Sequence, residues 1–274
     1  MPKVVCLSGR HTSNNLARSM KNLIVANWKC NPTTLKEAKQ LFDSIKKSAK
    51  NIKKSEVVLC PPFVFLKELS FFKKGSLVFF KLGAQNCFWE KFGAYTGEIS
   101  LPMLRDLGCE YVIVGHSERR KYFGETNEIV NKKLKAIIDA KLTAILCVGE
   151  TQEQRNNGET EKVLKEQIIK AIKNISCSKF HVSNVCIAYE PVWAIGTNNP
   201  CDHEEAQKMG LLIRKIISEI YSRPVSQKFR LIYGGSVKGD NAAGYIKEAG
   251  LNGLLVGGAS LDPKEFLGTI KSIE

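Results

Sequence analysis

Residues 143–190 contain the pattern on which the fold depends: TAILCV at 143–148, a long amphipathic stretch at 159–173, and VCIAYE at 185–190. The two short runs are apolar and almost uninterrupted, which is typical of parallel strands with both faces buried. The stretch between them has the length and the apolar spacing of a helix. These residues therefore predict a strand, a crossing helix and a second parallel strand.

Runs of this kind recur along the whole chain. They are LIVAN (23–27), VVLC (57–60), VFFKLGAQN (78–86), YVIVG (111–115), TAILCV (143–148), VCIAYE (185–190), RLIYG (230–234) and GLLVG (253–257). Helices are predicted at 33–49, 127–140, 159–173 and 204–221, and Asp240 and Asp262-Pro263 are the expected starts of the last two. Eight strand–helix units in about 235 residues favour a single-domain α/β fold, a closed (β/α)8 barrel, over an open doubly wound sheet.

The composition excludes two classes of protein. Of the 274 residues, 43% are hydrophobic, which is normal for a globular protein and too high for a disordered one. No run approaches the roughly 18 apolar residues that a membrane-spanning helix needs, so an integral membrane protein is excluded.

The charge is strongly basic and unevenly placed. The chain has 41 Lys and Arg against 27 Asp and Glu, a net charge of +14, and its first acidic residue is Glu37. Such an excess favours anionic ligands through long-range attraction, and nucleic acid is one class of these. The best support for nucleic acid is a lysine group: Lys46, Lys47, Lys50, Lys53 and Lys54. Because no aromatic residues alternate with these lysines, a solvated helix end is the favoured interpretation.

The nine cysteines indicate reduced thiols. Their number is odd, none forms a C-x-x-C motif, and the four histidines complete no zinc pattern. A reducing compartment such as the cytoplasm is therefore expected, rather than a disulfide framework.

Residues 1–20 do not follow the pattern of the barrel, which is expected to occupy 21–274. They contain no acidic residue and several serines and asparagines, a composition that leans toward a transit peptide. A weakly ordered extension without a targeting role is the other interpretation, and the composition does not separate the two.

Polar residues follow several of the expected strands at their carboxyl ends, where a barrel of this kind has its active site. They are Asn27-Trp28-Lys29 after strand 1, His116-Ser117-Glu118 after strand 4, Glu190 at the end of strand 6, Gly234-Gly235-Ser236 after strand 7 and Gly257-Gly258 after strand 8. Taken singly, each has a plain explanation as a surface charge or a turn. Together they bring a cation, an imidazole, a carboxylate and two glycine pairs to one mouth.

The glycine pairs predict a phosphate site. Glycine lacks a Cβ, so its backbone N–H can approach an anion closely. Many barrel enzymes bind phosphate with the loops that follow strands 7 and 8, which is where Gly234-Gly235 and Gly257-Gly258 occur.

Four segments resemble the triosephosphate isomerase family and occur in the family's order. They are Asn27-Trp28-Lys29, Gly115-His116-Ser117-Glu118-Arg119-Arg120, the run AYEPVWAIGT at 188–197, and Tyr233-Gly234-Gly235-Ser236. The resemblance covers about residues 21–274. It implies a TIM barrel that interconverts dihydroxyacetone phosphate and D-glyceraldehyde 3-phosphate through an enediol(ate), in glycolysis and gluconeogenesis, with no metal or cofactor and with neither nucleic acid nor a membrane as partner.

The resemblance also implies a role for each site residue. Glu190 is the base that moves the carbon-bound proton, and His116 is the neutral imidazole that polarises the carbonyl, as the family is generally understood to work. A helical turn beginning at Ser117-Glu118 would disfavour protonation of His116. Lys29 would stabilise the enediolate charge as the one cation at the rim, and Asn27 would position it. Further implied roles are phosphate binding by Gly196, Ser236, Gly257 and Gly258, and a buried supporting partner in Glu118.

Residues 191–201 resemble the family's mobile lid. A lid suits the chemistry, because an enediol phosphate exposed to water eliminates phosphate. Pro191-Val192-Trp193 matches the first hinge, whereas Asn198-Asn199-Pro200-Cys201 departs from the Gly- and Lys-rich form common in the family.

A homodimer is the expected assembly. The segment 85–98 resembles the family loop that inserts into the neighbouring subunit close to its Lys29, and it carries the aromatic residues Phe88, Trp89, Phe92 and Tyr95. Exposed aromatic residues in a long loop favour a contact surface independently of the resemblance. Cys30 occupies a position where methionine is common in the family.

One other enzyme class shares part of this pattern. Phosphate-binding barrels of tryptophan and thiamine biosynthesis have the glycine pairs, but they lack the Glu190-Pro191-Val192-Trp193 segment and the His116-Ser117-Glu118 turn. Turnover of triose phosphates separates the two classes.

Overall fold

Eight parallel strands pair in sequence order, and the last pairs with the first, so the sheet closes into a barrel. The computed structural model describes residues 21–48, 52–74, 80–175, 184–197 and 199–274. The strands are β1 (Asn22–Asn27), β2 (Ser55–Cys60), β3 (Phe80–Ala84), β4 (Cys109–Val114), β5 (Thr143–Val148), β6 (Val185–Tyr189), β7 (Arg230–Tyr233) and β8 (Gly253–Val256). The prediction of a closed barrel, rather than an open doubly wound sheet, is thereby confirmed.

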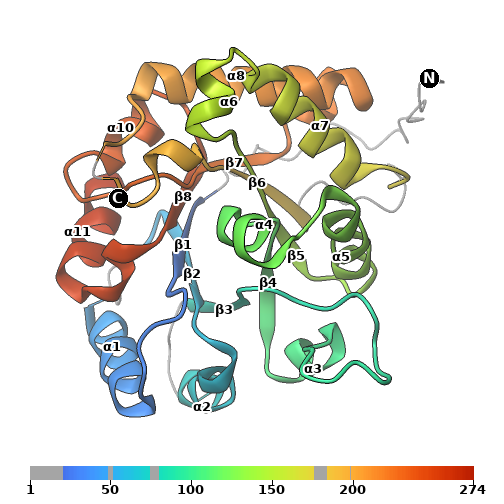
Figure 1. Cartoon of the computed structure of the whole chain (residues 1–274). Coiled ribbons are helices and arrows are strands. Elements are labelled where there is room, and N and C mark those ends of the chain that lie inside the picture. The colour runs from blue at the N-terminus through green and yellow to red at the C-terminus, as the bar shows by residue number, and fades with distance from the viewer. Residues whose placement is uncertain (1–20, 49–51, 75–79, 176–183, 198) are drawn as a thin grey trace, which may run out of the picture.

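Helices surround the strands, as Figure 1 shows. The longer ones are α1 (Leu35–Ser48), α2 (Phe63–Lys74), α5 (Asn127–Asp139), α7 (Thr160–Ile172), α8 (His203–Ile220) and α11 (Pro263–Ile273). The shorter ones are α3 (Leu101–Asp106), α4 (Ser117–Phe123), α6 (Gln152–Asn156), α9 (Arg223–Ser226) and α10 (Ala242–Lys247), with the 3-10 turns η3 (Val192–Ala194) and η4 (Gly258–Leu261). None of the helices in these described ranges is long and apolar enough to cross a membrane.

The helix predictions hold where an amphipathic period is strong. The stretches 33–49, 127–140, 159–173 and 204–221 correspond to α1, α5, α7 and α8 within a few residues, with residue 49 outside the described ranges. Asp262 caps α11 through its side chain as expected. Asp240 does not start a helix, because α10 begins at Ala242 behind Asn241. The sequence pattern missed α2, whose apolar residues surround much of its circumference, and the short helices α3, α6 and α9.

The core has two shells because side chains alternate along each strand. On β1, Ile24 and Ala26 pack outward against the helices, whereas Leu23 and Val25 point into the barrel. The inner shell includes Cys60, Cys147 and Cys186. Burial raises the pKa of the Cys186 thiol to about 12, so this cysteine behaves as a small packing residue.

A polar cluster closes the amino-terminal end of the barrel. Glu56 of β2 accepts hydrogen bonds from Tyr111 of β4 and from Arg230 of β7, and Lys81 of β3 lies 3.0 Å from its carboxylate. Arg230 also donates to the Tyr111 hydroxyl at 2.9 Å. Lys81 also lies 3.1 Å from Oε2 of Glu110 on β4, so four strands are joined at this end by two carboxylates and two cations.

Candidate active site

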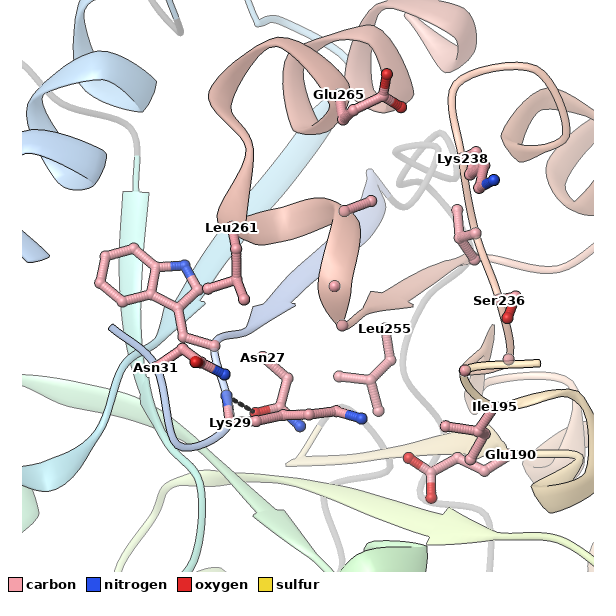
Figure 2. Close-up of a pocket in the computed structure, with 18 of the residues that line it drawn as sticks. Asn27, Lys29, Asn31, Glu190, Ile195, Ser236, Lys238, Leu255, Leu261 and Glu265 are labelled. Carbon is pink, nitrogen blue, oxygen red and sulfur yellow. Dashed lines mark hydrogen bonds between the residues drawn. The ribbon is translucent and has the colours of Figure 1, made fainter. Parts of the chain in front are cut away.

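A cavity of about 520 Å³ opens at the carboxyl ends of the strands. The eight residues predicted to catalyse or to bind phosphate all line it: Asn27, Lys29, His116, Glu190, Gly196, Ser236, Gly257 and Gly258. Figure 2 shows Lys29 and Glu190 extending from different strands toward the same space. The structure therefore brings the predicted residues together, while their chemical roles remain predictions.

Glu190 is a buried carboxylate with one oxygen held and one oxygen free. The side chain is 2% exposed, and its Oε2 accepts the backbone N–H of Ser117 at 3.1 Å. Its Oε1 lies 3.3 Å from Nε2 of His116 but makes no hydrogen bond of good geometry to any described residue. A buried acceptor without a partner is costly, so this oxygen is suited to take a proton from a ligand.

His116 caps helix α4, and the cap defines its tautomer. Its Nδ1 accepts the backbone N–H of Glu118 at 3.2 Å, so Nδ1 carries no proton. In a neutral ring the proton is then on Nε2, which faces the cavity near Glu190. The expected helical turn after His116 is present as α4, and its N-terminal N–H groups serve both His116 and Glu190.

Lys29 has an unusual backbone that its neighbours hold in place. Its φ is 54°, in the left-handed region that favours glycine and strains a lysine. The Lys29 N–H donates to Oδ1 of Asn27 at 3.1 Å, and Nε2 of Gln85 donates to the Lys29 carbonyl at 2.8 Å. This turn directs the ammonium group to within 3.7 Å of the position that a Cβ on Gly257 would occupy. The cation therefore lies beside the expected phosphate loop.

Glu118 differs in part from the expectation. It does pair with the site, because its Oε1 lies 2.6 Å from Nζ of Lys29. Its side chain is not buried, however, since 39% of it is exposed in this single chain. Glu118 lies in the first turn of α4, two residues after His116.

The glycines after β7 are needed for packing, as well as for the close approach of a phosphate to their backbone N–H groups. A Cβ on Gly235 would lie 2.2 Å from the Tyr233 hydroxyl, and one on Gly234 would lie 2.8 Å from Cγ of Glu190. By contrast, a Cβ on Gly258 would meet nothing within 4 Å. The glycine pair at 234–235 thus makes room for Glu190 and Tyr233, a role that the sequence pattern did not reveal.

The first half of the expected lid, residues 192–194, is held by a buried carboxylate that no sequence pattern indicated. Glu150 is fully buried, and its Oε1 accepts hydrogen bonds from Nε1 of Trp193 at 3.0 Å and from the hydroxyl of Tyr189 at 3.1 Å. Its carbonyl accepts the N–H of Val192 at 3.0 Å. On the other side, the Ser236 hydroxyl donates to the carbonyl of Ala194 at 2.7 Å. Residues 192–194 are therefore fixed from two loops.

Gly234 and Gly235, the glycine pair expected near the phosphate, also line the cavity, together with Trp28 and Ile195 of the two resembling segments. Further residues line it without having been predicted: Asn31, Val237, Lys238, Leu255, Ala259, Leu261, Asp262 and Glu265. Lys238 corrects the expectation that Lys29 is the one cation at this rim. Lys238 and Glu265 stand at the outer edge, away from Glu190 (Figure 2). The position of Lys238 two residues after Ser236 could have indicated its place, because that loop was already assigned to phosphate.

The described residues contain no group of three or more His, Cys, Asp or Glu side chains arranged to hold a metal ion. Among the polar groups that line the cavity are the His116 imidazole, the Glu190 carboxylate and the Lys29 ammonium. This set can accept and donate protons and can hold an anion.

Comparison with known proteins gives one consistent result. The family model described as triosephosphate isomerase matches residues 22–273. The triosephosphate isomerase of Dictyoglomus turgidum is 47% identical over 252 residues, covering 92% of this chain and 99% of the relative. That of Dictyoglomus thermophilum is 48% identical with the same coverage, and that of Aquifex aeolicus is 46% identical over 90% of this chain and 97% of the relative.

Proposed function

Because this chain belongs to the triosephosphate isomerase family, we propose that it interconverts dihydroxyacetone phosphate and D-glyceraldehyde 3-phosphate. The observation that carries the proposal is the approach of Glu190 Oε1 to within 3.3 Å of His116 Nε2, at the base of the cavity. Isomerisation moves one proton between two carbons and one between two oxygens. A free carboxylate oxygen beside an imidazole N–H supplies a group for each.

Glu190 acts first as the base. Its free Oε1 removes the proton from the carbon next to the carbonyl, and the electron pair moves onto the carbonyl oxygen to form an enediolate. The same carboxylic acid then returns the proton to the neighbouring carbon. The hydrogen bond from Ser117 to Oε2 keeps the carboxylate oriented through both steps.

His116 acts on the oxygens. Its Nε2–H donates toward the substrate carbonyl while Nδ1 is occupied by the Glu118 N–H, so the ring works as a neutral electrophile. The ammonium of Lys29 stabilises the negative charge that develops on the enediolate oxygen. In the free site it pairs with Glu118, a half-exposed carboxylate that solvates the cation between turnovers.

The phosphate is expected at the opposite end of the cavity. Gly257 and Gly258 lie at the start of the 3-10 turn η4, where backbone N–H groups are free to bind an anion. Gly196 and Ser236 line the same end. Closure of residues 191–201, of which residue 198 lies outside the described ranges, over this end then protects the enediolate from elimination of phosphate.

A coupled assay tests the function directly. Wild type should isomerise both triose phosphates, and Glu190→Ala should lose nearly all turnover while keeping a folded structure. Glu166→Ala is the matched control, because Glu166 is a half-exposed carboxylate that pairs with Lys170 on the surface of α7. Wild-type protein that is folded and dimeric yet inactive on both triose phosphates would refute the proposal.

We further propose that two copies of the chain form a homodimer through the segment 85–98 and the region around Cys30. Phe92 and Tyr95 of this segment are 86% and 44% exposed, and Tyr122 and Phe123 at the end of α4 are 66% and 68% exposed. Cys30 is exposed as well. Apolar surface of this extent supports association with a second chain. Sedimentation of wild type and of Phe92→Glu, which should be monomeric, tests the assembly.

A cytoplasmic location and a role in glycolysis and gluconeogenesis complete the proposal. The seven cysteines in the described ranges are all free thiols, which suits a reducing compartment. Residues 1–20 lie outside the described ranges, and their possible targeting role is decided by imaging fluorescent fusions of residues 1–274 and 21–274. Identical cytoplasmic distributions would exclude targeting by this extension.

A further inference from the structure

The carboxyl-terminal end of the segment 191–201 is held by two tyrosine hydroxyls. The backbone N–H of Cys201 donates to the hydroxyl of Tyr233 at 3.1 Å, and its carbonyl accepts from the hydroxyl of Tyr245 at 2.6 Å. Cys201 is 2% exposed and both tyrosines are fully buried. Both backbone polar groups of one buried residue thus depend on side chains from β7 and α10.

The two tyrosines form a stack, so that neither hydroxyl moves independently. Their ring centroids are 3.8 Å apart and the planes differ by 14°. Burial raises the pKa of Tyr245 to about 12, so its hydroxyl keeps its proton and donates at neutral pH. The Tyr233 hydroxyl occupies the space that a Cβ on Gly235 would need, which links the stack to the loop that carries Ser236.

A histidine supports the outer edge of this stack. The ring of His203 contacts Tyr245 edge to face at 4.7 Å, and its two nitrogens lie 3.3 Å from Oε2 of Glu248 and 3.1 Å from the carbonyl of Asn241. A Cβ on Gly244 would lie only 2.0 Å from the His203 ring. Gly244 therefore makes the space in which the imidazole supports Tyr245.

The same group of residues contacts the expected phosphate loop. The side chain of Asn241 donates to the carbonyl of Ser236 at 3.3 Å and accepts the N–H of Lys238 at 2.9 Å. Ser236 in turn contacts Ala194 in the first half of the segment 191–201. Tyr245 is thus connected to both halves of the segment 191–201, through Cys201 and through its contacts with Tyr233 and His203.

We propose that Tyr245 is a positioning residue for the isomerisation: its hydroxyl fixes Cys201, and so the end of the lid, relative to the phosphate loop. The inference rests on the proposed role of residues 191–201 as a lid. An enediolate phosphate that is exposed before it is reprotonated breaks its carbon–oxygen bond to phosphate. The products are inorganic phosphate and methylglyoxal, so elimination reports how well the lid is held.

The test measures isomerisation and elimination in parallel for wild type and Tyr245→Phe. Phenylalanine keeps the aromatic ring for the stack and removes the hydroxyl that donates to Cys201. We expect the share of turnovers that release phosphate to rise severalfold and the affinity for phosphoglycolate to fall about fivefold, the effect of losing one ordinary hydrogen bond. Because Glu190 and His116 are untouched, kcat should fall less than kcat/KM.

Tyr221→Phe is the matched control. Tyr221 also donates its hydroxyl to a backbone carbonyl, that of Ile175, at 3.1 Å, and burial raises its pKa to about 12 as well. It lies at the other end of α8 from His203, roughly 27 Å away along the helix at 1.5 Å per residue. Its loss should lower the unfolding midpoint without changing the elimination share.

Two further variants make the outcome decisive. Tyr233→Phe removes the other hydroxyl at Cys201, and Gly244→Ala displaces the His203 ring that supports Tyr245 while keeping the Tyr245 hydroxyl. Elimination raised by Tyr245→Phe and, to a smaller extent, by Gly244→Ala supports the inference. Elimination raised by Tyr233→Phe but by neither of these would overturn the role of Tyr245 and leave the lid intact. Elimination unchanged in every variant would show that neither tyrosine hydroxyl holds the end of the lid, and would refute the inference.

Discussion

The two ends of the barrel hold charged groups in opposite ways. At the amino-terminal end, Glu56 is surrounded by donors from Tyr111, Lys81 and Arg230. At the carboxyl-terminal end, Glu190 is more deeply buried, yet its Oε1 has no hydrogen-bond partner among the described residues. The first arrangement stabilises the folded chain. The second costs stability and leaves a carboxylate oxygen for substrate.

Strained backbone occurs at both ends, since Lys141 just before β5 also has a positive φ of 59°, but one strained residue belongs to the site. Lys29, with its φ of 54°, lies at the carboxyl-terminal end and is held there by Asn27 and Gln85. Strain and unsatisfied polar groups persist in proteins where the surrounding structure holds them and where function uses them. The comparison teaches that substitutions at one end should change activity and substitutions at the other should change stability.

After the loss of the base itself in Glu190→Ala, the largest effect is expected from Lys29→Met, which keeps the length of the side chain and removes its charge. Loss of one group that stabilises developing charge costs about 10² to 10³ in turnover. Phosphoglycolate should also bind more weakly, because the cation acts on the bound anion as well as on the transition state, although Lys238 retains some attraction. Unchanged affinity in a calorimetric titration would remove Lys29 from the site.

Glu190→Asp should come next. The shorter side chain keeps its charge but withdraws the carboxylate by roughly 1 Å, and a displacement of that size costs on the order of 100-fold. The coupled assay should show the loss in kcat, with the unfolding midpoint close to that of wild type. Turnover near the wild-type value would assign the base to another residue.

Arg230→Met should lower the free energy of unfolding without changing catalysis. Removing one partner of a buried ion pair costs about 3–5 kcal/mol, and we expect about 2 kcal/mol here because Lys81 and Tyr111 still contact Glu56. Urea unfolding measures this loss, and kcat/KM should stay within twofold of wild type. A large fall in kcat/KM with unchanged urea unfolding would show that the amino-terminal end contributes to catalysis and not to stability.

The same cluster predicts a pH dependence of stability. Burial raises the pKa of the Glu56 carboxyl, but the hydrogen bonds from Tyr111 and Lys81 and the charge of Arg230 outweigh it, so the net pKa is lowered. A lowered pKa in the folded state adds stability above the unfolded value of about 4.3, and this is lost as the pH falls through the folded value. Glu56→Gln should therefore flatten the acid limb of the unfolding midpoint measured from pH 6 to pH 3. An unaltered acid limb would mean that Glu56 does not contribute.

A smaller effect is expected from modification of Cys30, which follows Lys29 and belongs to the proposed dimer contact. A methylthio adduct should overfill that contact, so activity and dimer content should fall together. Cys30→Met should keep both and lose most of the sensitivity to the reagent. The other six thiols in the described ranges are buried. Equal sensitivity of the two proteins in sedimentation and activity would exclude Cys30.

The smallest effect is expected from deleting residues 1–20. The first strand begins at Asn22, and the site residues all lie beyond it. Catalytic efficiency should be unchanged, and the unfolding midpoint should shift by no more than a few degrees. A larger loss in either would show that the extension packs against the barrel.

The sequence predicts the fold and the chemical groups well because both follow from local patterns. Apolar runs mark each strand, and the residues after them, such as Lys29, His116 and Glu190, fall at one mouth once the barrel closes. Short helices such as α3 and α9 were missed because four to six residues span fewer than two turns, so no apolar repeat can be recognised.

The supporting contacts could not be predicted because they join residues far apart in the chain. Gln85 reaches the carbonyl of Lys29, and Glu150 holds Trp193, through geometry that no local pattern records. The exposure of Glu118 likewise depends on the direction in which α4 leaves β4.

A matched pair of substitutions tests the central contrast most directly. Glu190→Asp and Glu56→Asp make the same chemical change, one methylene removed from a buried or nearly buried glutamate, at opposite ends of the barrel. We predict that kcat/KM falls on the order of 100-fold in Glu190→Asp with unchanged urea unfolding, and that Glu56→Asp loses stability while keeping its kcat/KM. If both variants lose stability and activity in proportion, the division of the barrel into a chemical end and a stabilising end is wrong.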